Sequence, residues 1–280
     1  MGLVREDKMR KIAVGVVGVG GRMGVMTLKV ILEDPLANIA GGVVRTGSPM
    51  VGVDLGTIAG GDQFGIQVTD QLLEVFSKSD VVIDFSLPDA GAKIIEAALS
   101  TSTPLVVGTT GLTKSQEQAL MDTSKMVPLV YASNTSLGIN LLFALVEQIS
   151  RALPADFDIE VLDFHHNKKI DSPSGTALSL GHAAARGRDS NFDAVAKLSR
   201  EGEVGRRKEG EIGFAALRGG NVIGEHSVIF AGAGERIEVA HKTSGREIYA
   251  SGALRAAHWV YQQSCGFYTM RDVLGLPSII

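Results

Sequence analysis

One short segment of this sequence gathers most of the side chains that could do chemistry. Between Asp163 and Thr176 it holds two adjacent histidines, two lysines and two serines. A histidine titrates near neutral pH and can donate or accept a proton, and a lysine can hold a carboxylate or act as a charged donor. These residue types predict acid–base chemistry on a small anionic molecule.

The end of the same segment predicts the start of a helix. Ser174, Gly175 and Thr176 precede an apolar stretch, and the free N–H groups of a helix N-terminus favour a carboxylate. A solvated loop followed by a capped helix is the competing interpretation. No metal site is predicted, because adjacent histidines diverge in direction and no cysteine ligands accompany them. The remaining histidines are interpreted as structural: His182, His226, His241 and His258.

A glycine-rich turn near the N-terminus predicts a nucleotide site. The first β-branched run ends at Gly18-x-x-Gly21-x-x-Gly24, which is not the strict G-x-G-x-x-G spacing, and a helical stretch follows. A strand, glycine turn and helix in this order bring backbone N–H groups to a pyrophosphate. The alternative is a tight turn with no ligand. The residues predicted to line the cofactor here are Gly18, Val19, Gly20, Gly21, Arg22 and Met23.

The end of the second predicted strand bears on which nicotinamide is used. An acidic residue there would bind the ribose 2′-hydroxyl of NADH, but the sequence reads Val43-Val44-Arg45. Arg45 and Arg22 could instead contact a 2′-phosphate. We therefore predict NADPH as the preferred cofactor, with NADH as an alternative donor. The competing interpretation is that both arginines are solvated.

Two further loops follow predicted strands, where open α/β sheets bind their ligands. Their glycines could equally be turn residues, and Asn134 could cap a helix. The residues predicted to contact the cofactor are Gly108, Thr109 and Thr110 in one loop, and Ala132, Ser133, Asn134 and Thr135 in the other.

The elements that must position these residues alternate in the first half of the chain. Short apolar runs and amphipathic stretches alternate up to about residue 134, which predicts a parallel sheet with helices on both faces. The predicted strands are 12–17, 39–44, 81–85, 104–107 and 127–131, and the predicted helices are 23–33, 71–77, 90–99 and 114–125.

The pattern changes in the second half and predicts an α+β domain. Turn signals between the last three strands favour antiparallel pairing. The charged, glycine-rich stretch 187–210 is interpreted as a mobile or interface loop. The predicted helices are 136–153, 176–186 and 248–262, the last returning to the first domain, and the predicted strands are 159–164, 211–217, 222–230 and 236–240.

Composition excludes several functional classes. The net charge of −4 lacks the basic surplus of a nucleic-acid binder, and the single cysteine, Cys265, excludes a disulfide framework. No apolar run approaches the roughly 20 residues of a membrane span. The apolar run 12–19 meets Gly20, Gly21 and Arg22 rather than a signal-peptide cleavage pattern. We expect a cytoplasmic protein with no nucleic-acid or membrane partner.

Taken together, these motifs resemble the bacterial dihydrodipicolinate reductase family over essentially the whole chain. The His-His-x-x-Lys-x-Asp-x-Pro-Ser-Gly-Thr segment is highly specific for that family, whereas the glycine turn alone is not. The matching motifs are Gly-Gly-Arg-Met-Gly at 20–24, Ile-Asp-Phe-Ser at 83–86, Val-Gly-Thr-Thr-Gly at 107–111, Ala-Ser-Asn at 132–134, 165–176, Ser-Arg-Glu-Gly at 199–202, Ile-Gly-Glu-His at 223–226 and Met-Arg-Asp-Val-Leu at 270–274.

The resemblance implies a fold and an assembly. It implies an N-terminal Rossmann-like dinucleotide-binding domain, residues 1–134, rejoined by 245–280. Residues 135–244 would form a C-terminal α+β domain with a mixed or antiparallel sheet that binds substrate and builds a homotetramer.

The resemblance also implies a reaction in the diaminopimelate route to lysine. NAD(P)H would reduce 4-hydroxy-2,3,4,5-tetrahydrodipicolinate, a cyclic dicarboxylate, to 2,3,4,5-tetrahydrodipicolinate with loss of water. His165 would be the general acid, and Lys169 a proton donor or a cation that stabilises the imine. His166, Gly175 and Thr176 would bind the substrate.

Two positions depart from the family pattern. Many relatives have Glu where this chain has Val44, and some have an aromatic residue where it has Thr135. Two rival functions would share the glycine turn. Another two-domain nicotinamide enzyme would not need the histidine–lysine segment, and a non-catalytic nucleotide sensor would not need His165 with Lys169.

Overall fold

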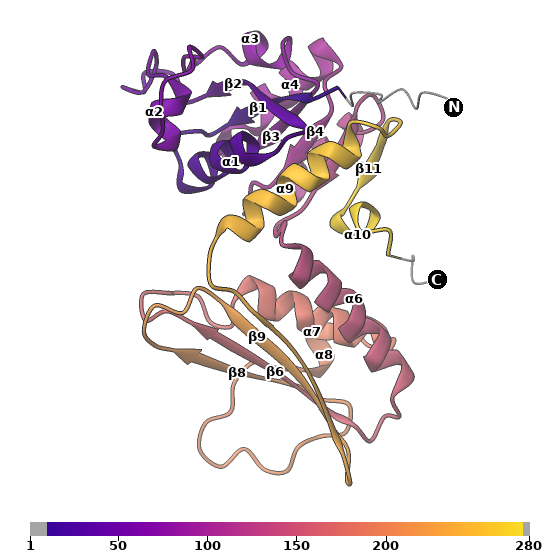
Figure 1. The fold of residues 1–280 in the computed structure, drawn as a ribbon. Helices are drawn as coiled ribbons and strands as arrows, with labels where there is room; N and C mark the ends of the chain where they lie inside the picture. The colour runs from indigo at the N-terminus through magenta and orange to yellow at the C-terminus, as the bar shows by residue number, and fades with distance from the viewer. Residues whose placement is uncertain (1–9, 277–280) are drawn as a thin grey trace, which may run out of the picture. The chain divides into compact units, whose positions relative to one another are not determined.

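The computed structural model describes residues 10–276, which form two compact units. The first unit comprises residues 10–136 and 247–275, and the second comprises residues 137–246 (Figure 1). Residues 1–9 and 277–280 of the predicted first domain lie outside the described part of the chain.

The first unit is built on a parallel six-stranded sheet. The strand order is β11-β5-β4-β3-β1-β2, and every pairing is parallel. Short β-branched runs such as Val81–Asp84 are buried along their whole length, as expected for strands covered on both faces. The strands are β1 Ile12–Val17, β2 Ala37–Val43, β3 Val81–Asp84, β4 Leu105–Val107, β5 Pro128–Tyr131 and β11 Gly266–Tyr268.

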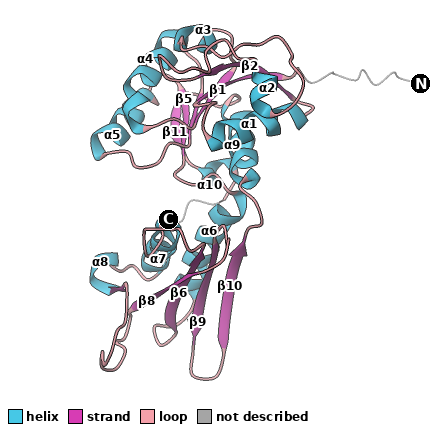
Figure 2. Cartoon of the chain, turned by 90° about the vertical axis from the view of Figure 1, so that its left-hand side faces the viewer, coloured by secondary structure: helices cyan, strands magenta, loops and turns pink. Residues whose placement is uncertain are grey.

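Helices cover both faces of this sheet. One face packs against α3, α4 and α5, which share a core cluster with the strands, and α1 and α9 pack together on the other (Figure 2). The helices are α1 Arg22–Glu33, α2 Leu55–Ala59, α3 Leu72–Phe76, η1 Pro88–Ala90, α4 Gly91–Thr101, α5 Lys114–Thr123, α9 Glu247–Val260 and α10 Met270–Val273. The predicted parallel α/β arrangement is confirmed.

The second unit is a mixed five-stranded sheet with helices α6 and α7 packed on one face. The strand order is β10-β9-β6-β8-β7, and the helices share an apolar core with the inner strands. The elements are α6 Leu137–Ala152, β6 Asp158–His165, α7 Gly175–Gly187, α8 Phe192–Val195, β7 Ala196–Lys197, β8 Ile212–Arg218, β9 Glu225–Ala231 and β10 Arg236–Lys242.

The pairing within this sheet corrects one sequence prediction. β9 and β10 pair antiparallel as expected, but β8 and β9 do not form a hairpin. The central strand β6 lies between them, parallel to β8 and antiparallel to β9. The turn at Gly219 and Gly220 therefore carries the chain across the end of β6, where the Gly219 N–H donates to the His165 carbonyl at 2.9 Å.

Two further differences concern short elements. The stretch 187–210, predicted as a loop, contains α8 and the edge strand β7. The sixth strand of the first sheet, β11, was not predicted, because three residues carry too little periodicity to be recognised. Among the described residues, no helix is both long and apolar enough to cross a membrane.

Candidate active site

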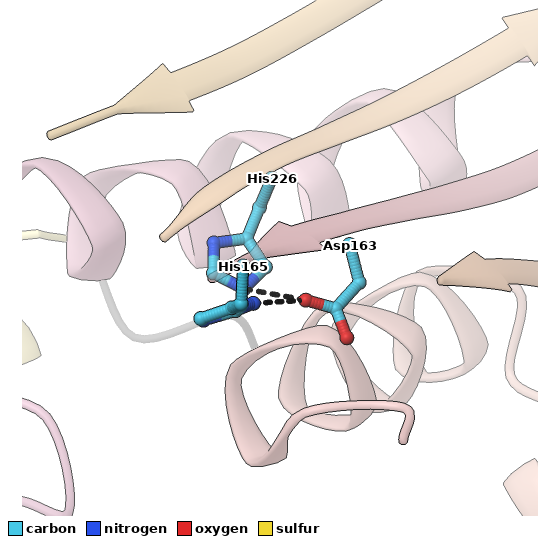
Figure 3. Close-up of side chains that lie close together, drawn as sticks. All are labelled: Asp163, His165 and His226. Carbon is cyan, nitrogen blue, oxygen red and sulfur yellow. Dashed lines mark ion pairs between the residues drawn. The ribbon is translucent and has the colours of Figure 1, made fainter. Parts of the chain in front are cut away.

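Strand geometry brings three titratable side chains together in the second unit. Side chains two residues apart on a strand point to the same face, so Asp163 and His165 share the buried face of β6. The antiparallel register places His226 of β9 directly opposite Asp163. Figure 3 shows the three side chains converging at the end of β6.

Asp163 is the centre of this group. Its Oδ1 lies 2.5 Å from Nδ1 of His165 and 3.7 Å from Nε2 of His226 (Figure 3). This contact becomes an ion pair only when His165 is protonated, and its geometry is not that of an aligned hydrogen bond. The other oxygen, Oδ2, accepts the backbone N–H of Ser174 at 2.7 Å and the Arg218 guanidinium at 3.3 Å. Burial alone would raise the pKa of Asp163, but the Ser174 amide and the neighbouring positive charges hold that pKa below its usual value.

His165 is buried, and its two ring nitrogens face different neighbours, Asp163 at Nδ1 and Gly224 near Nε2. Burial lowers the pKa of His165, and the charges of Lys169 and Arg218 lower it further, while Asp163 opposes both. A Cβ atom at Gly224 would lie 3.0 Å from Nε2 of His165. Any larger residue at this position would therefore crowd Nε2, while Nδ1 faces Asp163.

His226 is part of this site, which corrects its interpretation as a structural histidine. Its Nε2 lies 3.1 Å from the Ser174 hydroxyl, and its ring meets the His165 ring edge to face at a centroid distance of 5.1 Å. Burial lowers the pKa of His226 to about 4. The imidazole is therefore neutral at physiological pH and links the N-terminus of α7 to the carboxylate of Asp163.

Asp163, His165 and His226 could also be considered as ligands of a metal ion. Their ligand atoms all lie within 4.8 Å of one another. Two ligands on one tetrahedral ion with bonds of about 2.0–2.1 Å would stand roughly 3.3 Å apart, however. The 2.5 Å between Asp163 Oδ1 and His165 Nδ1 is shorter and fits an acid–histidine pair better.

The loop between β6 and α7 supplies the rest of the predicted substrate site. Ser174 caps α7, because its hydroxyl accepts the Ala177 N–H at 3.2 Å, and the helix begins at Gly175, one residue before its predicted start at 176. Lys169 forms an ion pair with Asp171 at 2.8 Å. Its positive charge also lowers the pKa of His165. His166 accepts the Lys168 N–H on its Nδ1 at 3.2 Å.

In the first unit, the glycine turn has a shape that only glycines permit. Gly18 has φ +85°, and a Cβ there would lie 2.7 Å from the Phe85 carbonyl oxygen. A Cβ at Gly24 would collide with the Gly18 carbonyl. The third glycine therefore lets α1 pack directly on the turn. No described side chain caps α1 at Gly21, so its first N–H groups point outward, where a pyrophosphate could accept them.

The exposure of the residues near the end of β2 bears on the cofactor prediction. Arg22 is the first residue of α1, and Arg45 is an exposed residue just beyond β2. Val44 is buried, and its N–H donates to the Thr69 carbonyl. This position therefore packs in the protein interior and presents no acceptor to a ribose.

In the loops after β4 and β5, some of the residues predicted to contact the cofactor are exposed and others make contacts inside the protein. The Thr109 hydroxyl donates to Asp84 at 2.9 Å, and the Thr135 hydroxyl donates to the Tyr249 carbonyl at 2.6 Å, so both side chains point into the protein. The Asn134 side chain accepts the Ser136 N–H at 2.9 Å, in a turn just before α6 begins at Leu137. Ser133 and Thr110 are exposed, whereas Gly108 is partly buried and Ala132 is buried.

Two family models match nearly the whole described chain. Residues 12–135 match dihydrodipicolinate reductase, N-terminus, and residues 138–274 match dihydrodipicolinate reductase, C-terminus. The chain belongs to the dihydrodipicolinate reductase family. It is accordingly an oxidoreductase.

Curated relatives agree with this family assignment, and a solved structure shares the fold. The chain is 43% identical over 265 residues to the 4-hydroxy-tetrahydrodipicolinate reductase of Halorhodospira halophila, covering 95% of this chain and 99% of the relative. It is 45% identical over 272 residues to the reductase of the same name from Sinorhizobium medicae, covering 97% and 99%. A dipicolinate-bound dihydrodipicolinate reductase from Paenisporosarcina sp. TG-14 shares the fold, with a TM-score of 0.75 at 20% identity, covering 94% of this chain and 98% of that one.

Sequence reasoning gave no role in the site to Asp163 or His226. Asp163 stands two residues before His165 on a predicted strand, so the alternation of the strand was a sufficient signal. His226 had only its place in the Ile-Gly-Glu-His motif, because its position opposite Asp163 depends on the pairing of β6 with β9.

Proposed function

We propose that His165 of this chain donates the proton in the reduction of 4-hydroxy-2,3,4,5-tetrahydrodipicolinate to 2,3,4,5-tetrahydrodipicolinate, with NADPH as the preferred donor. This reduction, with loss of water, is the step in lysine and diaminopimelate synthesis for which the family is named. The observation that carries the residue assignment is the buried Asp163–His165–His226 group beside the N-terminus of α7.

The chain's residues act on the carbon skeleton of the substrate. NADPH, when bound, would supply a hydride for C4 of the conjugated imine that remains after water leaves. The electron pair displaced by the hydride makes an enamine, and His165 donates a proton from Nε2 to its carbon. Asp163 stabilises the imidazolium at Nδ1, and Lys169 places a cation beside the developing negative charge.

The substrate's carboxylates fit the N-terminus of α7. Gly175 is exposed and has no neighbouring atom within 4 Å of a Cβ position, so its backbone N–H can be approached closely. The N–H groups of Gly175 and Thr176 and the ring of His166 would hold one carboxylate. Arg218 and Lys169 supply the positive field that attracts a dianion in a chain with a net charge of −4.

The glycine turn and the exposed loop residues would hold the cofactor. The uncapped N-terminus of α1 suits the pyrophosphate, and Arg45 with Arg22 suits a 2′-phosphate. NADH would lack one ribose hydrogen bond to an acidic residue, worth about 1.5–3 kcal/mol. NADH would therefore react, but less efficiently than NADPH.

One face of the second sheet supports our proposal that the chain forms a homotetramer. We also propose that the protein is cytoplasmic, as expected for a biosynthetic enzyme. Core residues such as Val161 and Phe230 face α6 and α7, so the alternating residues point to the other side. That side carries the apolar side chains of Leu162, Phe164 and Leu217, the last 46% exposed. Sedimentation velocity is expected to show a tetramer, and a monomer at micromolar concentration would contradict it.

The activity is tested by generating the substrate in place. Aspartate semialdehyde, pyruvate and the preceding synthase are mixed with the protein, and nicotinamide absorbance is followed with NADPH and NADH in parallel. Fast synthase-dependent oxidation of NADPH is the expected result. Equal oxidation rates with NADH and NADPH would contradict the cofactor preference but not the proposed reaction. Binding of both cofactors without their oxidation would contradict the proposed reaction.

The role of His165 is tested with a matched histidine. His165→Gln is expected to lower turnover by about 10²–10⁴-fold, the usual contribution of a general acid, with NADPH affinity unchanged. His182→Gln alters a histidine on α7 that stacks on Phe192, outside the site, and is expected to retain turnover. Unchanged turnover in His165→Gln would remove it as the proton donor.

A further inference from the structure

The Ile-Asp-Phe-Ser motif at 83–86 is not used by the mechanism above, yet it contains a buried carboxylate. Asp84 is the last residue of β3 and is 3% exposed. Burial raises its pKa, and only hydrogen bonds from Ser86 and Thr109 oppose that effect. Burying a carboxyl group costs stability unless hydrogen bonds offset the cost. The hydrogen bonds of Asp84 show which segments it holds together.

The two carboxylate oxygens of Asp84 reach two different loops. Oδ1 accepts the backbone N–H of Ser86 at 2.8 Å and so fixes the turn after β3. Oδ2 accepts the Thr109 hydroxyl at 2.9 Å and so fixes the loop after β4. The Asp84 carbonyl also accepts the Gly108 N–H at 2.9 Å.

The turn that Asp84 fixes is packed between the two glycine loops. A Cβ at Gly18 would lie 2.7 Å from the Phe85 carbonyl oxygen, and a Cβ at Gly108 would collide with the Phe85 ring. The Phe85 N–H donates to the Val17 carbonyl at the end of β1. A shift of the turn at 85–86 would therefore move the glycine turn and the 108–110 loop together.

We propose that Asp84 is a positioning residue that holds the three loops after β1, β3 and β4 in the arrangement that binds the nicotinamide cofactor. This inference rests on the proposed cofactor site at 18–23 and 108–110. The hydrogen bond from the Thr109 hydroxyl to Asp84, called the tie below, holds the loop at 108–110 in place. The backbone of this loop is then available to contact the cofactor. Asparagine at position 84 would remove one of the two acceptors, because its amide nitrogen would face either the Ser86 N–H or the Thr109 hydroxyl. The Thr109 proton would then have to turn to its other acceptor, the Ser86 carbonyl oxygen at 3.3 Å.

The test compares near-isosteric variants that keep or remove this tie. Asp84→Asn and Thr109→Val disrupt it, and Thr109→Ser restores the hydroxyl. Thr103→Val is the matched control, because Thr103 is a buried threonine at the opposite end of β4 whose hydroxyl donates to the Phe76 carbonyl at 3.2 Å. The measurements are NADPH affinity by fluorescence, the KM for each substrate, and urea unfolding.

The tie predicts a change in cofactor affinity beyond any change in stability. Asp84→Asn and Thr109→Val are expected to raise the NADPH Kd and KM about tenfold, an affinity loss of about 1.4 kcal/mol. The KM for the imine substrate at saturating NADPH should not change, and Thr109→Ser should bind as the parent does. Because both changes break one interaction, the double variant should bind no more weakly than Asp84→Asn alone.

Several outcomes would overturn the inference. One is that folded Asp84→Asn or Thr109→Val binds NADPH with the affinity of the parent protein. Another is that Thr103→Val weakens NADPH binding as much as these two variants do. If Asp84→Asn does not fold, the comparison of Thr109→Val with Thr109→Ser decides the question. If the parent protein itself does not bind NADPH, the proposed cofactor site fails as well, and the two failures are thereby distinguished.

Discussion

At the scale of single residues, the charge of Asp163 controls when His165 can donate a proton. A general acid must be protonated, so kcat/KM falls as pH rises through the pKa of His165 in the free enzyme. Burial, Lys169 and Arg218 hold that pKa below its usual 6.5, and Asp163 is the one group that raises it. The two carboxylates of a bound substrate would raise it again, so the corresponding fall in kcat lies at higher pH.

Replacing Asp163 should therefore shift the pH profile in a defined direction. In Asp163→Asn the charge that raises the His165 pKa is lost, so the fall in kcat/KM is expected to move to lower pH, with lower activity near neutrality. The control is Asp156→Asn, which alters an exposed carboxylate before β6 and should leave the profile in place. A profile for Asp163→Asn that overlays the parent's would show that Asp163 does not act on His165.

At the scale of elements, the packing of α1 on the glycine turn determines the cofactor site. The Cβ of Gly24→Ala would collide with the Gly18 carbonyl, and the two backbones cannot both stay in place. We expect weaker NADPH binding and a loss of about 1–3 kcal/mol in the free energy of unfolding, the usual cost of overpacking. Urea titration and fluorescence measure these quantities.

Gly91→Ala is the matched control for that change. Gly91 begins α4, has no atom within 4 Å of its Cβ position and has φ −54°, so alanine fits there without strain. This variant should be as stable as the parent or slightly more stable, because alanine is the better helix former. Equal NADPH affinity in the Gly24 and Gly91 variants would contradict the packing argument.

At the scale of the whole molecule, the first unit is made from two distant parts of the chain. Helix α9 buries Ala253, Leu254 and Ala257 and packs on α1, and the Tyr249 carbonyl accepts the Thr135 hydroxyl. Residues 135 and 249 are therefore neighbours, and a short glycine–serine linker can join 136 to 247. Such a shortened chain is expected to fold and bind NADPH, but to have no reductase activity, because His165 is absent.

The control for this prediction is a second truncated protein, which ends at residue 246. It retains the glycine turn but loses α9 and β11, so one face and one edge of the first sheet lose their cover. We expect it to lose NADPH binding, as measured by fluorescence. Retained binding would show that α9 is dispensable for the first unit.

The local elements and the family segment follow from the sequence itself. The strand 12–17 is recognisable as a short β-branched run, and Gly18 as a residue type that permits the positive φ of the turn after it. Ser174 is recognisable as a capping residue at the start of a helix. Each of these features depends on neighbouring residues alone. The His-His-x-x-Lys segment likewise identified the family before any pairing was known.

The tertiary structure alone decided which distant residues meet. The turn at 219–220 carries hairpin residues, but β6 pairs with both flanking strands, and that choice depends on a core shared with α6 and α7. Strand pairing then placed His226 opposite Asp163, and the order of the parallel strands placed Asp84 beside Thr109. Sequence patterns report the environment of each residue, whereas contacts between residues far apart in the chain depend on register and packing, which no local pattern contains.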